Sequence, residues 1–403
     1  MLIEFKFRNF LSFKDEVNFL MTPVKSFKEL TKTNVIKTEK DFDLLKVAAV
    51  FGANGSGKSS FIKAFSFFSN LVHSSFADSL NKKKERNARN NHFRLSTESE
   101  TGDTMFEVSI LIGEVIYRYG YELSGYIVKR EWLFRKVERE IMLYDRNRQD
   151  FEITKDSFVE GLKYHGEVNE NVLFLSHLAQ YNQPISKEIF QWFNNANAID
   201  GIDEQLYSTF TAELLKEDNN FKEWATIALK YLEIANIEAG EQDGEIITYH
   251  RKFDENNLIV EAIPFKAHME SDGTRKLIHI LGPLYSTLSN GGVLFVDEFD
   301  CKLHPNLTKK LLSLFQKYNK RGAQFIFSAQ DTNLLNKKLL RRDQIWFTNK
   351  DQFGVSSLYS LSEFNASAVR NTSDFAKKYL SNTFGAAETL EITDKLTNLL
   401  YGK

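Results

Sequence analysis

Residues 45–60 read L-K-V-A-A-V-F-G-A-N-G-S-G-K-S-S. The short apolar run Leu45–Phe51 is typical of a buried strand, and residues 58–73 are predicted to form a helix. Between them, Gly52–Ser59 satisfies the pattern G-x-x-x-x-G-K-[ST] at every fixed position. Glycines let consecutive N–H groups turn toward an anion, and a helix start adds its positive end. The stretch therefore predicts a phosphate-binding loop rather than an ordinary strand–turn–helix connection.

This loop assigns a first set of residues to ATP and Mg²⁺. Lys58 is expected to reach the β- and γ-phosphates, and Ser59 is expected to offer its hydroxyl to Mg²⁺. The predicted ATP-binding residues are Gly52, Ala53, Asn54, Gly55, Ser56, Gly57, Lys58, Ser59 and Ser60.

A second apolar run, Val293–Val296, ends in the two acids Asp297 and Glu298. Charge is costly to bury, and ligands of α/β sheets bind at the carboxyl ends of strands. We therefore expect Asp297 to hold Mg²⁺ through water and Glu298 to orient and deprotonate an attacking water. The alternative is a pair of solvated acids at a strand end.

The rest of the chain suggests an α/β protein in three parts. Period-two patterns predict strands at 2–7 and 16–21, an antiparallel run over 105–153, and further strands over 246–265. Helical spacing dominates 157–235, and helix and strand alternate from 270 to about 330. The predicted units are an N-terminal lobe (1–153), a helical insertion (154–245) and a C-terminal lobe (246–403). The basic run Lys82–Arg94 is predicted to be a solvated loop, with contact to nucleic acid as the alternative.

Composition excludes several classes of protein. The chain has 403 residues, is 42% hydrophobic and 26% charged, and has a formal net charge of −2. That balance fits a globular protein and argues against one that coats nucleic acid by bulk charge. Only one cysteine is present, and no apolar run is long enough to span a bilayer. A cytoplasmic location without membrane contact is expected.

More than half of the chain separates Lys58 from Asp297, which is the plan of ABC-type ATPases. Residues 8–13 (R-N-F-L-S-F) resemble the opening of SMC/RecF-type ATPase heads. Residues 270–274 (E-S-D-G-T) resemble an abbreviated ABC signature, 303–305 (L-H-P) a family turn, and 324–335 the next strand and switch. The whole order resembles AAA-type ATP-binding proteins related to OLD-family ATPases, which occur in bacterial abortive-infection and other anti-phage operons.

The resemblance implies an α/β, ABC-type (SMC/RecF-head-like) P-loop ATPase with an antiparallel β subdomain and a helical insertion. Two heads would pack head to tail around two ATP molecules, with Ser271 and Gly273 contacting the γ-phosphate held by the partner's loop. Read without the resemblance, Ser271–Thr274 is a helix N-cap. The family's switch normally carries His where this chain has Gln330. Because Gln cannot carry positive charge, slow hydrolysis is expected, with Lys58, Glu298 and Gln330 as the catalytic residues.

The implied function is that of an ATPase subunit in a bacterial anti-phage defence system. It would form a homodimer or higher homo-oligomer and control a separately encoded effector, a nuclease or toxin, through nucleotide-dependent dimerisation. A nucleic acid or a phage protein would be the trigger. The alternative is a RecF/SMC-like ATPase of DNA repair or chromosome handling; a transporter subunit and a non-hydrolysing scaffold are further alternatives. The Q-loop glutamine has no evident position near residues 90–93.

Overall fold

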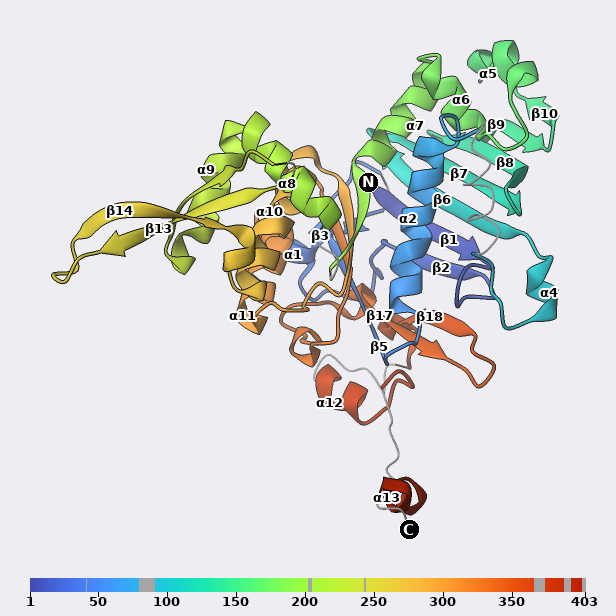
Figure 1. The fold of residues 1–403 in the computed structure, drawn as a ribbon. Helices are drawn as coiled ribbons and strands as arrows, with labels where there is room; N and C mark the ends of the chain where they lie inside the picture. Colours follow the sequence, from blue (N-terminus) through green and yellow to red (C-terminus); the bar gives the residue numbers. More distant parts are fainter. Residues whose placement is uncertain are drawn as a thin grey trace.

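The structure is a computed structural model that describes residues 1–40, 42–79, 91–201, 205–242, 244–365, 374–387 and 393–400. Most of the basic run 82–94 lies outside these residues. Figure 1 shows two large sheets with helix α2 between them and a separate hairpin arm that projects from the body. No helix in the described ranges is long and apolar enough to cross a membrane.

The first large sheet has seven strands and is antiparallel throughout. Its strands, in spatial order, are β10 (Asp150–Ile153), β9 (Glu140–Asn147), β8 (Ile127–Lys136), β7 (Val115–Ser124), β6 (Thr104–Ile112), β1 (Leu2–Arg8) and β2 (Val17–Leu20). The period-two pattern over 105–153 therefore correctly predicted a run of antiparallel strands.

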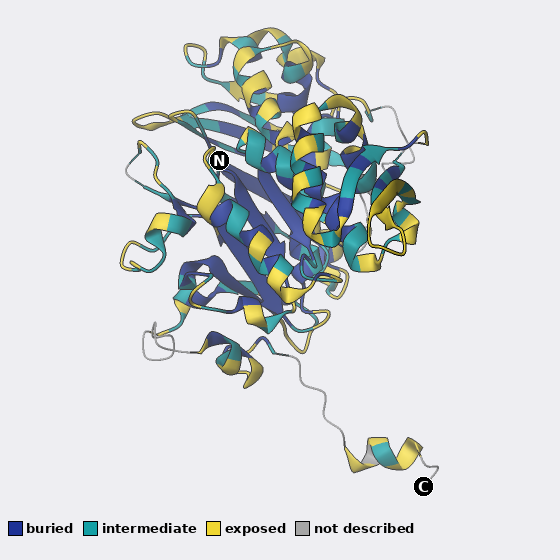
Figure 2. Cartoon of the chain, turned by 90° about the vertical axis from the view of Figure 1, so that its left-hand side faces the viewer, coloured by how far each residue is buried: buried dark blue, intermediate teal, exposed yellow. Residues whose placement is uncertain are grey.

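The second large sheet has six strands and is parallel except at β18. Its order is β11 (Ala196–Asp200), β15 (Val293–Asp297), β16 (Gln324–Ser328), β5 (Val47–Gly52), β17 (Ile345–Lys350) and β18 (Ser356–Ser360). The central strands are buried along their whole length, which explains their continuous apolar runs. Figure 2 shows this sheet as the buried centre, with half-exposed helices around it.

Two smaller sheets and the remaining helices complete the fold. The three-stranded sheet holds β12 (Ile234–Ala239), β13 (Ile246–Phe253) and β14 (Ile259–Lys266), and the two-stranded one holds β3 (Val35–Ile36) and β4 (Leu44–Leu45). The α-helices are α1 (Thr31–Asn34), α2 (Lys58–Ser74), α4 (Thr97–Glu100), α5 (Val159–Tyr164), α6 (Phe174–Gln180), α7 (Pro184–Asn194), α8 (Gln205–Glu217), α9 (Asn219–Leu229), α10 (Asp272–Asn290), α11 (Pro305–Ser313), α12 (Phe375–Leu380) and α13 (Asp394–Leu400).

The expected helical insertion contains α5 to α9, but it also contains β11 and β12. Strand β11 is an edge strand of the six-stranded sheet and pairs with β15. The insertion therefore supplies part of the parallel sheet, which its helical spacing did not indicate. The three-part division of the chain stays a prediction.

The two large sheets share one core, and phenylalanine fills much of it. Phe61, Phe65 and Phe68 of α2 are fully buried. They pack against Phe5 of the antiparallel sheet. Phe65 also stacks on Phe295 of the parallel sheet, with 3.9 Å between the two ring centres. These rings are therefore part of the core between the two sheets. The buried Gln324 side chain adds a polar link, because it bonds both the N–H and the carbonyl of Leu2.

Helices α2 and α10 cover opposite faces of the parallel sheet. One hydrophobic core unites α2 with Ala48, Val50 and Phe295. A second core unites α10 with the strand residues that alternate with these, among them Ala49 and Val296. Because successive side chains of a strand point to opposite faces, the two helices are separated by the sheet.

The antiparallel sheet is joined to the insertion by a buried carboxylate, that of Glu131 on β8. It accepts hydrogen bonds from Tyr119, from Tyr144 and from the N–H groups of Phe174 and Leu175 at the start of α6. It also pairs with Arg146 at 3.4 Å, and both side chains are fully buried. The carboxylate thus stabilises the helix N-terminus and neutralises a buried cation.

We predict that Glu131→Gln lowers the free energy of unfolding by about 3–5 kcal/mol, because the substitution leaves the buried Arg146 without a counter-charge. Urea unfolding followed by circular dichroism measures this change. Glu152→Gln, at an exposed position of β10, is the matched control. Equal midpoints for the two variants would contradict the structural role of Glu131.

Candidate functional site

The predicted phosphate loop connects β5 to α2, and its backbone needs glycine. Gly55 and Gly57 have φ values of 73° and 121°, which side chains other than glycine rarely adopt. A Cβ at Gly57 would also lie 2.7 Å from the Ser356 hydroxyl oxygen. The loop is tied to β17 by a 2.6 Å hydrogen bond between the buried hydroxyls of Ser56 and Thr348.

Lys58 lies at the first position of α2 and is largely buried, with 6% of its surface exposed. Its ammonium group donates to the carbonyl oxygens of Gly52 and Ala53 at 2.7 and 3.1 Å. The charge is therefore held across the mouth of the loop.

The donors of the loop fit a phosphate group. The first backbone hydrogen bond of α2 runs from Phe61 N to the Gly57 carbonyl, so the N–H groups of residues 58–60 precede the hydrogen-bond ladder of the helix. Gly57, the N-cap residue, has no side chain to cap them. Uncapped N–H groups, a positive helix end and a buried ammonium form the chemistry of an anion site.

Strand β15 ends at the predicted acidic pair, and the hydroxyl of Ser328 forms hydrogen bonds with both acids. Ser328, at the end of the neighbouring strand β16, donates a hydrogen bond to Asp297 Oδ1 and accepts one from Glu298 N at 2.8 Å. The buried Lys276 of α10 donates to the Glu298 carbonyl at 2.9 Å. Glu298 has a φ of 46°, an unfavourable angle for a residue with a side chain, and these bonds hold it there.

Gln330, the predicted switch residue, lies beside Glu298. Its side-chain amide donates to Glu298 Oε1 at 3.4 Å, and its backbone N–H donates to Asp300 at 2.9 Å. The neutral amide is therefore next to the predicted catalytic base.

The parallel register brings the loop and the acids to one edge of the sheet. Ser328 of β16 is opposite Val50 of β5, and Phe327 is opposite Val296 of β15. The carboxyl ends of these strands therefore lie side by side. Residues of α2, among them Ile62 and Ser66, line a cavity of about 200 Å³ together with Asp297.

Ser271 and Gly273 lie on the other face of the sheet from helix α2, which follows the phosphate loop. Ser271 is the N-cap of α10, where its hydroxyl accepts from Thr274 N at 3.2 Å, as the capping alternative predicted. A Cβ at Gly273 would lie 2.8 Å from the Lys302 carbonyl oxygen. Because α10 and α2 cover opposite faces, the phosphate loop and Ser271–Gly273 of one chain are on different sides of the sheet.

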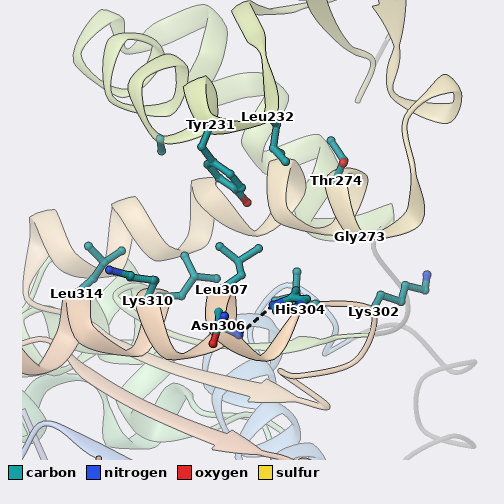
Figure 3. A pocket seen from close by; sticks show the side chains of 13 residues that line it. Tyr231, Leu232, Gly273, Thr274, Lys302, His304, Asn306, Leu307, Lys310 and Leu314 are labelled. Atoms are coloured by element: carbon teal, nitrogen blue, oxygen red, sulfur yellow. Dashed lines mark hydrogen bonds between the residues drawn. The ribbon is translucent and has the colours of Figure 1, made fainter.

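A mainly apolar cavity of about 660 Å³ opens beside Gly273 and Thr274. Figure 3 shows these two residues facing His304, with leucines of α11 along the floor. His304 is the N-cap of α11, and its Nδ1 accepts from Asn306 N at 3.2 Å. His304 therefore begins α11 next to the signature-like segment.

Several residues of the site were not identified from the sequence. Ser328 orients Asp297 and fixes the peptide of Glu298, and its position at the end of strand β16 was the available signal. Lys276 had no signal, because it reaches Glu298 from another element. Gly201 donates its N–H to the Asp297 carbonyl at 2.8 Å, and a Cβ there would clash with that oxygen.

Comparison with known proteins gives one family. Residues 47–336 match a family described as "AAA domain, putative AbiEii toxin, Type IV TA system". No curated protein matches the chain.

Heads of SMC proteins are among the solved structures with some similarity to this chain. The SMC head domain from Thermotoga maritima has 13% identity and a TM-score of 0.41, and the alignment covers 89% of this chain and 98% of that one. The SmcHead bound to the C-winged helix domain of ScpA has 14% identity and a TM-score of 0.39, covering 89% and 97%. The Smc head domain with an extended coiled coil, from Pyrococcus furiosus, has 13% identity and a TM-score of 0.38, covering 89% and 96%.

The family match spans well over half of the chain and includes the phosphate loop, the acidic strand and the switch. The fold has the mixed α/β architecture expected for an ABC-type P-loop ATPase. The chain belongs to the AAA domain family of P-loop proteins.

Proposed function

We propose that this protein is an ATP-binding and slowly ATP-hydrolysing subunit of a bacterial anti-phage defence system, acting on a separately encoded nuclease or toxin. The observation that carries the ATPase part is the shared carboxyl edge of β5, β15 and β16, where the phosphate loop and the acidic pair meet. The defence part is supported by the family description, which names a type IV toxin–antitoxin system.

Each residue has a proposed role that follows from its position. Residues 52–60 bind the phosphates through backbone N–H groups, and Lys58 neutralises the β- and γ-phosphates. Glu298 orients and deprotonates the attacking water. Bound Mg²⁺, held by the Ser59 hydroxyl and, through water, by Asp297, would neutralise charge on the phosphates. These two oxygen donors suit Mg²⁺, which usually takes one or two carboxylates together with phosphates and water.

The active site is proposed to be completed by a second copy. Ser271 and Gly273 start a 19-residue helix, α10, whose N-terminus can donate to a phosphate. Within one chain that helix is on the far face of the sheet from α2. A head-to-tail dimer would place it against the partner's loop, and opening or closing of this dimer would control the effector.

We predict that Glu298→Gln lowers ATP turnover at least 100-fold and leaves the affinity for ATP nearly unchanged, because the amide cannot accept the water proton. Phosphate release measures turnover, and equilibrium binding of labelled ATP measures affinity. Glu255→Gln, at an exposed position in the hairpin arm, is the control. Unchanged turnover and unchanged nucleotide retention in Glu298→Gln would reject Glu298 as the base and favour a scaffold that only binds ATP.

The same variant tests the cellular role. Bacteria that express the protein with its neighbouring genes should resist phage, and the Glu298→Gln version should alter that resistance as measured by plaque counts. Equal plaque counts for wild type, variant and empty vector would contradict a defence function. DNA binding that tightens with ATP, without phage resistance, would favour the repair or chromosome-handling alternative.

We predict slow turnover in the wild type and an increase of about tenfold in Gln330→His. A positively charged imidazole would make a charge-assisted hydrogen bond where the amide makes a neutral one, and a gain of about 1.4 kcal/mol is a factor of ten in rate. Gln330→Ala is the control and should give no increase. A fast wild type, or a histidine variant no faster than wild type, would contradict the assignment of Gln330.

A further inference from the structure

A third cavity, of about 390 Å³, lies at the opposite edge of the parallel sheet from the phosphate loop. It is lined by the segment between β2 and β4 and by Arg341. Arg341 shortly precedes the start of β17, and the β3–β4 pair shortly precedes β5. Since β5 and β17 are parallel, residues before both strands lie at the amino edge, away from the ATP site.

Four lysines line this cavity: Lys25, Lys28, Lys37 and Lys40. Lys37 pairs with Asp43 at 2.5 Å. The other three form no ion pair with an acid among the residues that the structure describes. Three lysine charges around one small cavity repel one another, so an anion bound between them would be stabilised.

Arg341 holds the inner wall of the cavity in place, and its charge is already paired with that of Asp343. Its guanidinium group makes two hydrogen bonds to Asp343 and donates to the carbonyl oxygens of Phe27 and Glu29 at 3.2 and 2.6 Å. Arg341 is 1% exposed. It therefore fixes the segment that carries Lys25 and Lys28, and the lysines supply the charge available to a ligand.

The cavity also has an aromatic lining, formed by Phe27 and Phe42. The Arg342 guanidinium lies 3.7 Å from the centre of the Phe27 ring, which fixes that ring. The volume is within the range of small-molecule sites, about 300–1,000 Å³. Flat apolar rings can stack on a base, and several lysines can bind its phosphates.

We propose that this cavity binds a nucleotide unit, with phosphate oxygens at Lys25, Lys28 and Lys40 and the base against Phe27 and Phe42. The unit is either a free nucleotide or the end of a single strand, because both present the same chemistry. This site is separate from the ATP site and does not depend on the proposed hydrolysis.

The test uses the full chain in Mg²⁺ without added ATP or ATP analogue, because a free nucleotide would also occupy the proposed cavity. The probe is a fluorescent, 5′-phosphorylated ten-nucleotide oligo(dT), and binding is followed by anisotropy. We expect K25A/K28A/K40A to weaken binding at least tenfold. The plot of the logarithm of the association constant against the logarithm of the salt concentration should become less steep by about 2. Three phosphate contacts in a single strand contribute about 0.7 each to that slope.

The matched control is K309A/K337A/K338A, which removes three lysines from another cavity of about 390 Å³, one that Asp374 also lines. Binding by this variant should stay within twofold of wild type, and both variants should keep the wild-type melting temperature. Competition by free dTMP identifies a free nucleotide as the ligand, and binding without competition identifies the strand end. Failure of wild type to bind either probe, an unaffected K25A/K28A/K40A, or equal losses in both variants would overturn the site.

Discussion

The acidic half of the site depends on two hydrogen bonds of the Ser328 hydroxyl. It donates to Asp297 and accepts from the backbone of Glu298, so it orients one acid and fixes the peptide of the other. Lys276 holds the same peptide through its carbonyl, and Glu298 is thereby kept at a positive φ. Functional residues are often held in such unfavourable conformations by their surroundings. The two strands must be adjacent and parallel for this arrangement, and the order β15–β16–β5 provides it.

The same sheet that gathers these groups also separates the signature-like segment from them. Helix α2 covers one face and α10 the other, while both helices begin near the carboxyl edge, one at the phosphate loop and the other beside Lys302. A single chain therefore presents two halves of a nucleotide site that face different directions. This geometry gives a physical reason for the proposed dimer and for control by opening and closing.

The parts of the structure with strong local signals could be predicted from the sequence. The phosphate loop was predictable because its glycines are needed for backbone conformation, and the antiparallel strands were predictable from alternation. Strand β11 was missed because it lies among helices and is only five residues long. Lys276 and Gly201 were missed because their roles depend on contacts with residues far away in the chain. The lysine cavity was missed for the same reason, since it joins residues 23–43 with Arg341.

The most direct test of the account mixes two inactive variants, Lys58→Ala and Ser271→Arg. In a head-to-tail dimer, one site of each mixed dimer carries both substitutions and the other site carries neither. Random exchange at equal concentrations makes half of the dimers mixed, so ATP turnover should recover to about a quarter of wild type. Turnover that remains at the level of the separate variants would contradict a site built from two copies.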